Sequence, residues 1–251
     1  MNMSERVLYR DGLVLVIDKP AGIPVHAGPG GGAHLEHWFA LLRFGLPRPP
    51  ALAHRLDRDT SGCLVLGRHP KALRRLGRLF AERQVEKVYW AIVTGVPSEP
   101  AGRIATGLRK ETRGRVGWHM VVDPAGSPAV TDYRVRGTAN GRAWLELRPR
   151  TGRTHQIRVH CAALGVPVVG DLTYGGTYGG TYGGPGGATM QLHARSIALP
   201  LYPARAPIVV TAPVPPHMLA ALAALGYDPA SDTTSHEAPA ARGPIEEAIP
   251  A

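Results

Sequence analysis

Residues 54–62 read HRLDRDTSG, a segment that gathers charged side chains, one histidine and two hydroxyls within nine positions. It follows a proline-rich loop and precedes the apolar run Cys63–Leu66, which is typical of a buried strand. A core strand would not accept such a density of polar groups, whereas a loop at the start of a strand would. The segment therefore predicts a polar loop leading into the core, and an ordinary surface turn is the alternative.

Apolar periodicity on either side predicts further elements. Residues Leu13–Asp18 (LVLVID) form a strand candidate that ends in the turn sequence KPAG. Residues Pro70–Arg83 place Leu73, Leu76 and Phe80 at helical spacing behind an N-terminal proline, which predicts an amphipathic helix. Residues Val85–Thr94 alternate as a strand, with Val88, Trp90 and Ile92 on one face and Lys87, Tyr89, Ala91 and Val93 on the other.

The second half of the chain predicts a hairpin, a helix and more strands. Asn140-Gly141 between Val130–Val135 and Ala143–Leu147 is a strong hairpin signal. Thr154 is a candidate cap for a helix that ends at Gly165 and has Ile157, Cys161 and Leu164 on one side. Residues Leu192–Leu199 and Ile208–Thr211 are also strand candidates, and Pro216–Tyr227 a short helix. We expect an α+β fold on a mainly antiparallel sheet.

Two segments carry no pattern for a core. Residues 173–184 repeat TYGG three times, which predicts an extended, mobile loop. Residues 228–251 are polar, rich in Pro and Ala, and without period, which predicts a disordered tail. The expected organisation is thus one domain over residues 1–227, followed by that tail.

The composition indicates the kind of binding partner and the cellular location of the protein. The net charge is +10, and 25 of the 29 basic residues are arginines, whose planar fork suits phosphate. This excess favours a nucleic-acid partner, and a GC-rich genome is the plain alternative. No run of about 18 apolar residues spans a membrane, and the N-terminus lacks a secretory core, so we expect a cytoplasmic protein. The two cysteines, Cys63 and Cys161, are expected to be buried free thiols.

Two further polar clusters accompany the first: KVY at residues 87–89 and TGRTHQIRVH at residues 151–160. In this company HRLDRDTSG closely resembles the HRLDxxTSG motif of the RluA-type RNA pseudouridine synthases. The similarity continues in DKPAG at 18–22, GDLTYG at 170–175 and LHA at 192–194, and covers roughly residues 7–213. Each motif alone is weak, but together and in order they identify the chain as resembling this family.

The resemblance implies a pseudouridine synthase catalytic fold with helices and loops around a mixed, mainly antiparallel sheet. It implies an isomerase that flips a uridine out of structured tRNA or rRNA and converts it to pseudouridine, without metal or cofactor. Asp57 matches the catalytic carboxylate, Arg158 the arginine that pairs with it, and Tyr89 the tyrosine that stacks on the base. We expect RNA contacts from Arg55, Arg58, Lys19, Arg153 and His155, and a monomer without an obligate protein partner.

Competing interpretations remain open at this point. Asp59 is the other candidate for the catalytic acid, Tyr89 could be an ordinary strand aromatic, and Arg158 an exposed helical charge. The pair Asp57 and Asp59 also resembles the acids of haloacid-dehalogenase-type phosphatases, although a downstream acidic pair is missing. A protein of this fold that binds RNA without activity is a third possibility. The spacing of the histidines, with few acids or cysteines near them, speaks against zinc.

Overall fold

The computed structural model describes residues 2–28, 31–112, 114, 117–175 and 189–232. The strands are β1 (Val7–Arg10), β2 (Val14–Lys19), β3 (Ala51–Leu52), β4 (Ser61–Gly67), β5 (Glu86–Thr94), β6 (Ala101–Thr112), β7 (Trp118–Val122), β8 (Ser127–Ala139), β9 (Arg142–Pro149), β10 (Leu192–Leu199) and β11 (Ile208–Thr211). The helices are η1 (Met3–Arg6), η2 (Leu35–Leu42), α1 (Pro70–Ala81), α2 (Gln156–Ala163) and α3 (Pro216–Ala224), where η marks a 3-10 helix.

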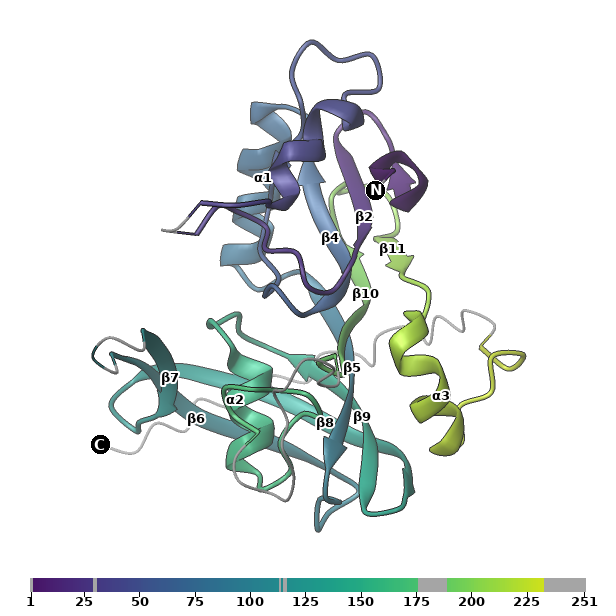
Figure 1. Ribbon diagram of the computed structural model, residues 1–251. Helices are drawn as coiled ribbons and strands as arrows, with labels where there is room; N and C mark the ends of the chain where they lie inside the picture. The colour runs from purple at the N-terminus through teal and green to yellow at the C-terminus, as the bar shows by residue number, and fades with distance from the viewer. Residues whose placement is uncertain (1, 29–30, 113, 115–116, 176–188, 233–251) are drawn as a thin grey trace.

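The strands form one sheet in the order β1-β2-β4-β10-β5-β9-β8-β6-β7, with β3 added on β4 and β11 on β10. Among the described strands every pairing is antiparallel except that of β4 with β10. The α+β prediction with a mixed, mainly antiparallel sheet is therefore confirmed. β10, late in the chain, joins the β1–β4 part of the sheet to the β5–β9 part (Figure 1).

The β1–β4 part is covered on both faces. Alternate residues of β2 and β4 point to opposite sides, as the pleat of a strand requires. Val14, Val16 and Val65 pack with Leu76 and Leu79 of α1. On the other side, neighbouring residues of the same strands pack with η2; these are Leu15, Ile17, Leu64 and Leu66 against Leu35, Phe39 and Leu42. The predicted strands and the predicted amphipathic helix are confirmed here.

The β5–β9 part has the same construction. Ala91, Val93 and Leu145 pack with Ile157 and Cys161 of α2. The opposite face carries Trp90, Ile92 and Trp144, which pack with Met218 and Leu222 of α3. The alternation predicted for residues 85–94 is therefore confirmed, and α2 is fixed to the sheet by the side predicted for it.

The predicted hairpin turn and the predicted end of α2 are confirmed, but the predicted N-terminal cap of α2 is wrong. Asn140 and Gly141 both have positive φ, 50° and 68°, as a tight hairpin between β8 and β9 requires. Gly165, with φ of 80°, ends α2 as predicted. Thr154, however, does not cap α2: His155 is the capping residue and its side chain makes no capping hydrogen bond. The Gln156 side chain instead accepts from the backbone N–H of Arg153 at 3.0 Å.

Some predictions fall partly outside the described residues. Of the TYGG repeat only residues 173–175 are described, and of the predicted tail only residues 228–232. Asp232 accepts hydrogen bonds from Arg195 and from the Tyr227 hydroxyl. Both cysteines are buried and free, as expected. In the part of the chain that is described, no helix combines the length and apolar character needed to cross a membrane.

Candidate active site

The loop that carries Asp57 is held from beneath by Lys19. The ammonium group donates to the backbone carbonyls of Pro20, Arg58 and Thr60 at 2.8, 2.8 and 2.9 Å. The Lys19 side chain is fully buried, and burial lowers its pKa to about 8. The prediction that Lys19 contacts RNA is therefore wrong, because all three donors of its ammonium group are used inside the protein.

Behind the loop, Ser61 and Gly62 join β4 to β10. The Ser61 hydroxyl and Nδ1 of His193 are 2.8 Å apart. Gly62 has a φ of +104°, and a Cβ at this position would lie 2.3 Å from the backbone oxygen of Ala194. Only glycine permits this approach. The TSG and LHA motifs thus meet in space, and their contact fixes where the Asp57 loop begins.

Arg158, on α2, faces two carboxylates. Its Nη1 donates to Oδ2 of Asp57 at 3.3 Å, while Nε and Nη2 donate to the two oxygens of Asp171 at 2.6 and 2.8 Å. The side chain is 9% exposed, so an unpaired charge there would be costly. Burial opposes the charge, but the hydrogen bonds and charge of Asp171, followed by those of Asp57, raise the pKa of Arg158 above its ordinary value. The predicted pairing of Arg158 with Asp57 is present.

Asp171 is the residue that sequence reasoning undervalued. It organises the turn that follows it, because its carboxylate accepts from the backbone N–H groups of Thr173 and Tyr174 at 2.9 and 3.1 Å. Its side chain is also completely buried against Arg158 and so fixes the direction of the guanidinium fork. The acidic residue in the GDLTYG motif was the available signal, but its partner lies 13 residues earlier in the chain.

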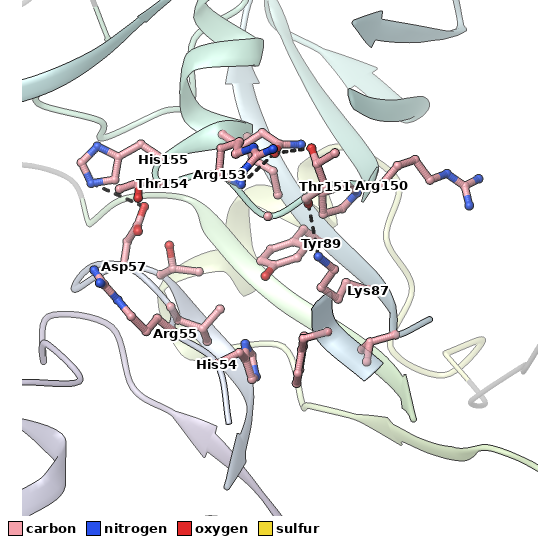
Figure 2. Close-up of a pocket in the computed structure, with 18 of the residues that line it drawn as sticks. His54, Arg55, Asp57, Lys87, Tyr89, Arg150, Thr151, Arg153, Thr154 and His155 are labelled. Atoms are coloured by element: carbon pink, nitrogen blue, oxygen red, sulfur yellow. Dashed lines mark hydrogen bonds and ion pairs between the residues drawn. The ribbon is translucent and has the colours of Figure 1, made fainter. Parts of the chain in front are cut away.

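β5 supplies the floor of the site. Tyr89 and Lys87 alternate with the core residues of this strand, and both line the cavity. Burial, and then the negative charge of Asp57, raise the pKa of Tyr89, so the phenol stays neutral. Burial lowers the pKa of Lys87 to about 8, and its ammonium group donates to the carbonyl of Thr151 at 3.3 Å. Figure 2 shows both side chains between the Asp57 loop and the 151–155 segment.

His155 stands at the rim, in a left-handed backbone conformation with φ of 53°. Its Nε2 lies 3.9 Å from Oδ2 of Asp57, and its Nδ1 lies 2.7 Å from the hydroxyl of Tyr174. The imidazole stacks on Trp118 of β7, with ring centroids 5.2 Å and planes 17° apart. A strained, non-glycine conformation at a rigidly held polar side chain is typical of functional sites.

These residues surround a cavity of about 600 Å³, a size usual for ligand sites. Of the residues expected from the sequence, those that line it are Asp57, Tyr89, Arg158, Arg55, Arg153 and His155. Lys19 and Arg58 do not, and the guanidinium of Arg58 is exposed and paired with Asp59 at 3.1 Å. Arg83 and Arg150, which the motifs did not single out, line the cavity as well.

The arrangement can perform chemistry that needs one anionic group. Asp57 lies in the cavity with a guanidinium beside it, while Asp59 is turned away toward Arg58. The two acids therefore do not form the converging pair that a magnesium-dependent phosphatase requires. Within the described ranges, no group of three or more His, Cys, Asp or Glu side chains is arranged to hold a metal ion.

Fold and cavity together define a protein with a single paired carboxylate in a basic site suited to a polyanionic substrate. The sequence profile of the family described as RNA pseudouridylate synthase matches residues 13–163. An uncharacterized RNA pseudouridine synthase of Zymomonas mobilis is 44% identical over 85% of this chain and 95% of its own length. Ribosomal large subunit pseudouridine synthase D of Xylella fastidiosa is 39% identical over 89% of this chain and 70% of its own.

A solved structure titled human RNA pseudouridylate synthase domain containing 4 has a TM-score of 0.73 at 28% identity, covering 89% of this chain and 94% of that one. The chain belongs to the RNA pseudouridylate synthase family. It is an RNA pseudouridine synthase, an isomerase, and its substrate is RNA.

Proposed function

We propose that this enzyme isomerises specific uridines in structured ribosomal or transfer RNA, with Asp57 as the catalytic carboxylate. The observation that carries the proposal is the placement of the Asp57 carboxylate in the cavity, 3.3 Å from the guanidinium of Arg158. Two relatives bear the name ribosomal large subunit pseudouridine synthase D, so large-subunit ribosomal RNA is the first substrate to test.

The reaction breaks the bond between C1′ of the ribose and N1 of uracil, turns the base, and joins C1′ to C5. N1 gains a proton and C5 loses one, so no oxidant, reductant or water is consumed. One carboxylate can begin it, either as a nucleophile at C1′ or as a base toward the hydrogen on C2′. Arg158 donates a hydrogen bond to Asp57 and so directs its carboxylate into the cavity.

Tyr89 and the basic rim would receive the flipped nucleotide. The neutral ring of Tyr89 offers a face on which uracil can stack, and such stacking is worth roughly 1–3 kcal/mol per base in nucleic-acid complexes. Arg55 and Arg153, both exposed at the cavity, are placed to contact phosphates next to the target. Arg55 can also occupy the space that the flipped base leaves in the RNA, because it neighbours the catalytic loop.

The decisive experiment compares Asp57→Asn with its matched control, Asp59→Asn. RNA from a host strain without the gene is incubated with each protein, and pseudouridines are mapped separately in ribosomal and transfer RNA. We expect the Asp57 variant to bind RNA but form no pseudouridine, and the Asp59 variant to modify the same sites as wild type. No magnesium or other cofactor should be needed for the chemical step with prefolded RNA. Near-normal turnover by Asp57→Asn would remove Asp57 from its proposed role.

A further inference from the structure

The imidazole of His155 has neighbours on all sides, yet the chemistry above does not use it. Its ring rests on Trp118, its Nδ1 meets the hydroxyl of Tyr174 at 2.7 Å, and its Nε2 faces Asp57 across 3.9 Å. Each contact comes from a different element: β7, the segment after Asp171, and the catalytic loop. Three independent contacts that orient one polar side chain toward the cavity indicate a specific task for Nε2.

The hydrogen bonds of Tyr174 favour one tautomer of His155. The phenol oxygen accepts from the backbone N–H of Met120 at 2.9 Å. Among the described residues its only other hydrogen-bond partner is Nδ1 of His155. A phenol that accepts from Met120 still has its one hydrogen to donate, and donating it to Nδ1 satisfies both groups, which favours Nδ1 as the unprotonated nitrogen. The neutral ring then carries its hydrogen on Nε2, the nitrogen that faces Asp57.

The burial of the His155 ring favours its neutral form. Burial lowers the pKa of His155; the carboxylates of Asp57 and Asp171 oppose this effect, while Arg158 and Arg55 reinforce it, and the net direction is down. A neutral imidazole beside a carboxylate is a poor partner for phosphate but a good hydrogen-bond donor to a hydroxyl. Its surroundings therefore disfavour a phosphate as the partner of His155, and the RNA contact expected from this residue is better made to a hydroxyl.

The space between Nε2 and Asp57 has the dimensions of one bridging oxygen. At 3.9 Å the two atoms are too far apart for a direct hydrogen bond. An oxygen placed about 2.8 Å from each atom would complete two bonds. Both residues line the cavity, and 18% of the His155 and 24% of the Asp57 side chain are exposed. A substrate group can therefore enter the gap.

The identity of the bridging oxygen follows from the proposed role of Asp57, and the inference rests on that role. A carboxylate that reacts at C1′ or C2′ of the ribose lies next to the hydroxyl on C2′. This hydroxyl both accepts and donates, so it can accept from Nε2 and donate to Asp57. We infer that His155, held by Tyr174 as its Nε2–H tautomer, donates a hydrogen bond to the 2′-hydroxyl of the target nucleotide and so selects RNA over DNA at the reacting sugar.

The test combines two substitutions of His155 with one change in the substrate, so that each enzyme is assayed on both substrates. The substrates are two synthetic fragments of an RNA that the wild-type enzyme modifies, with uridine or 2′-deoxyuridine at the target. The variants are His155→Leu, which lacks a donor, and His155→Gln, whose amide N–H₂ lies near the position of Nε2. Both place a non-glycine residue in the same left-handed conformation, so their backbone costs match. Single-turnover rates at saturating enzyme are measured on both substrates. The ratio of the uridine rate to the 2′-deoxyuridine rate is the 2′-deoxy penalty of each enzyme.

For wild type we expect the 2′-deoxy penalty to include a factor of roughly 3–10 from this hydrogen bond. His155→Leu should lose that factor, whereas His155→Gln should largely retain it. If His155 were only structural, both variants would slow both substrates equally and leave the penalty unchanged. An unchanged penalty in His155→Leu would overturn the inference.

Nitrogen NMR of the protein labelled with ¹⁵N-histidine tests the tautomer without RNA. The signal of His155 is the one that His155→Gln removes. We expect a neutral ring protonated at Nε2, and a shift toward a tautomer mixture in Tyr174→Phe. A ring protonated at Nδ1 would contradict the inference. Activity of Asp57→Asn would instead overturn the proposed function, and the nitrogen spectra would still decide the tautomer.

Discussion

Arg158 shows how one residue can serve structure and chemistry at the same time. Two of its donors go to Asp171, whose side chain is fully buried, and one goes to Asp57 at the cavity. The two hydrogen bonds to Asp171 fix the plane of the guanidinium, and this plane sets the direction in which Nη1 donates to Asp57. Asp171 is in this sense a positioning residue for Asp57, because it acts on that carboxylate through the guanidinium of Arg158.

Replacement of this residue should separate charge from geometry. Arg158→Lys keeps the charge, but one ammonium cannot both fork onto Asp171 and reach Asp57. We expect its single-turnover rate to fall roughly a hundredfold, as for other misplacements near 1 Å, with little change in RNA affinity. Arg158→Met should in addition lower the free energy of unfolding by about 3–5 kcal/mol, because the buried Asp171 loses its only cationic partner among the described residues.

Stopped single-turnover assays and urea unfolding measure both effects. Arg142→Met is the control, since Arg142 is exposed at the β8–β9 hairpin and makes no contact with either carboxylate. An Arg158→Lys enzyme as fast as wild type would show that the guanidinium geometry is not needed.

At the scale of elements, the junction of β4 with β10 sets the position of the catalytic loop. Gly62→Ala would force a Cβ into the backbone of Ala194 at a φ of +104°. We expect the free energy of unfolding to fall by roughly 3 kcal/mol, at the upper end of ordinary substitutions. Gly12→Ala is the control, because a Cβ there meets nothing within 4 Å. Equal stability of the two variants would mean that β10 can move away from β4 without cost.

The sequence predicted the elements whose residues had a single clear pattern. Continuous apolar runs predicted β2 and β4, and alternation predicted β5; residues Leu192–Leu199, the later β10, were also a strand candidate. β6 was not predicted. Most of its residues are exposed or half-buried, and it includes Gly102 and Gly107, so neither face of the strand has an apolar pattern in the sequence. β7 depends on pairing with β6 and has little signal of its own.

The site was predictable to the extent that each motif carries its own residues. Asp57, Tyr89 and Arg158 were expected together and do line one cavity. What motifs could not report is direction: Lys19 looks like a surface lysine in its KPAG turn, yet three carbonyls from two segments converge on its ammonium group. Likewise Trp118, outside every motif, reaches the site only through the fold of the β6–β7 pair.

For the whole molecule, the net charge of +10 should appear in the salt dependence of RNA binding. Each phosphate neutralised adds roughly 0.7–0.9 to the slope of log affinity against log salt concentration. Arg55→Gln and Arg153→Gln should each reduce that slope by about one such increment. Arg205→Gln, exposed and stacked on Tyr202 outside the cavity, should leave it unchanged. A wild-type slope near zero would mean that the charge is not used for RNA.

Acid should destabilise the protein through two fully buried histidines. Burial lowers the pKa of His193 to about 3 and of His160 to about 4, against 6.5 for an unperturbed imidazole. Between pH 6.5 and pH 4 the unfolded chain therefore binds more protons than the folded one, and stability falls as the pH falls. Each histidine contributes up to about 1.4 kcal/mol per pH unit.

Urea unfolding at several pH values checks this, with His160→Gln as the informative variant. Its stability should decline less steeply from pH 6.5 to pH 4 than that of wild type. Parallel curves for the two proteins would show that His160 takes no part in acid unfolding.

The central place of β10 has a consequence for how the enzyme is made. Ribosomes deliver β4 and β5 early, but the strand that lies between them ends at Leu199, more than a hundred residues after Gly67. At about 5–20 residues per second, on the order of 10 seconds pass after β5 before β10 exists to pair with β5 and with Ser61 and Gly62 of β4. Unpaired strand edges are sites of faulty pairing. Maturation of the catalytic centre therefore waits for the synthesis of β10, and a ribosome that stalls before residue 192 leaves a nascent chain in which these positions of β4 and β5 have no partner strand.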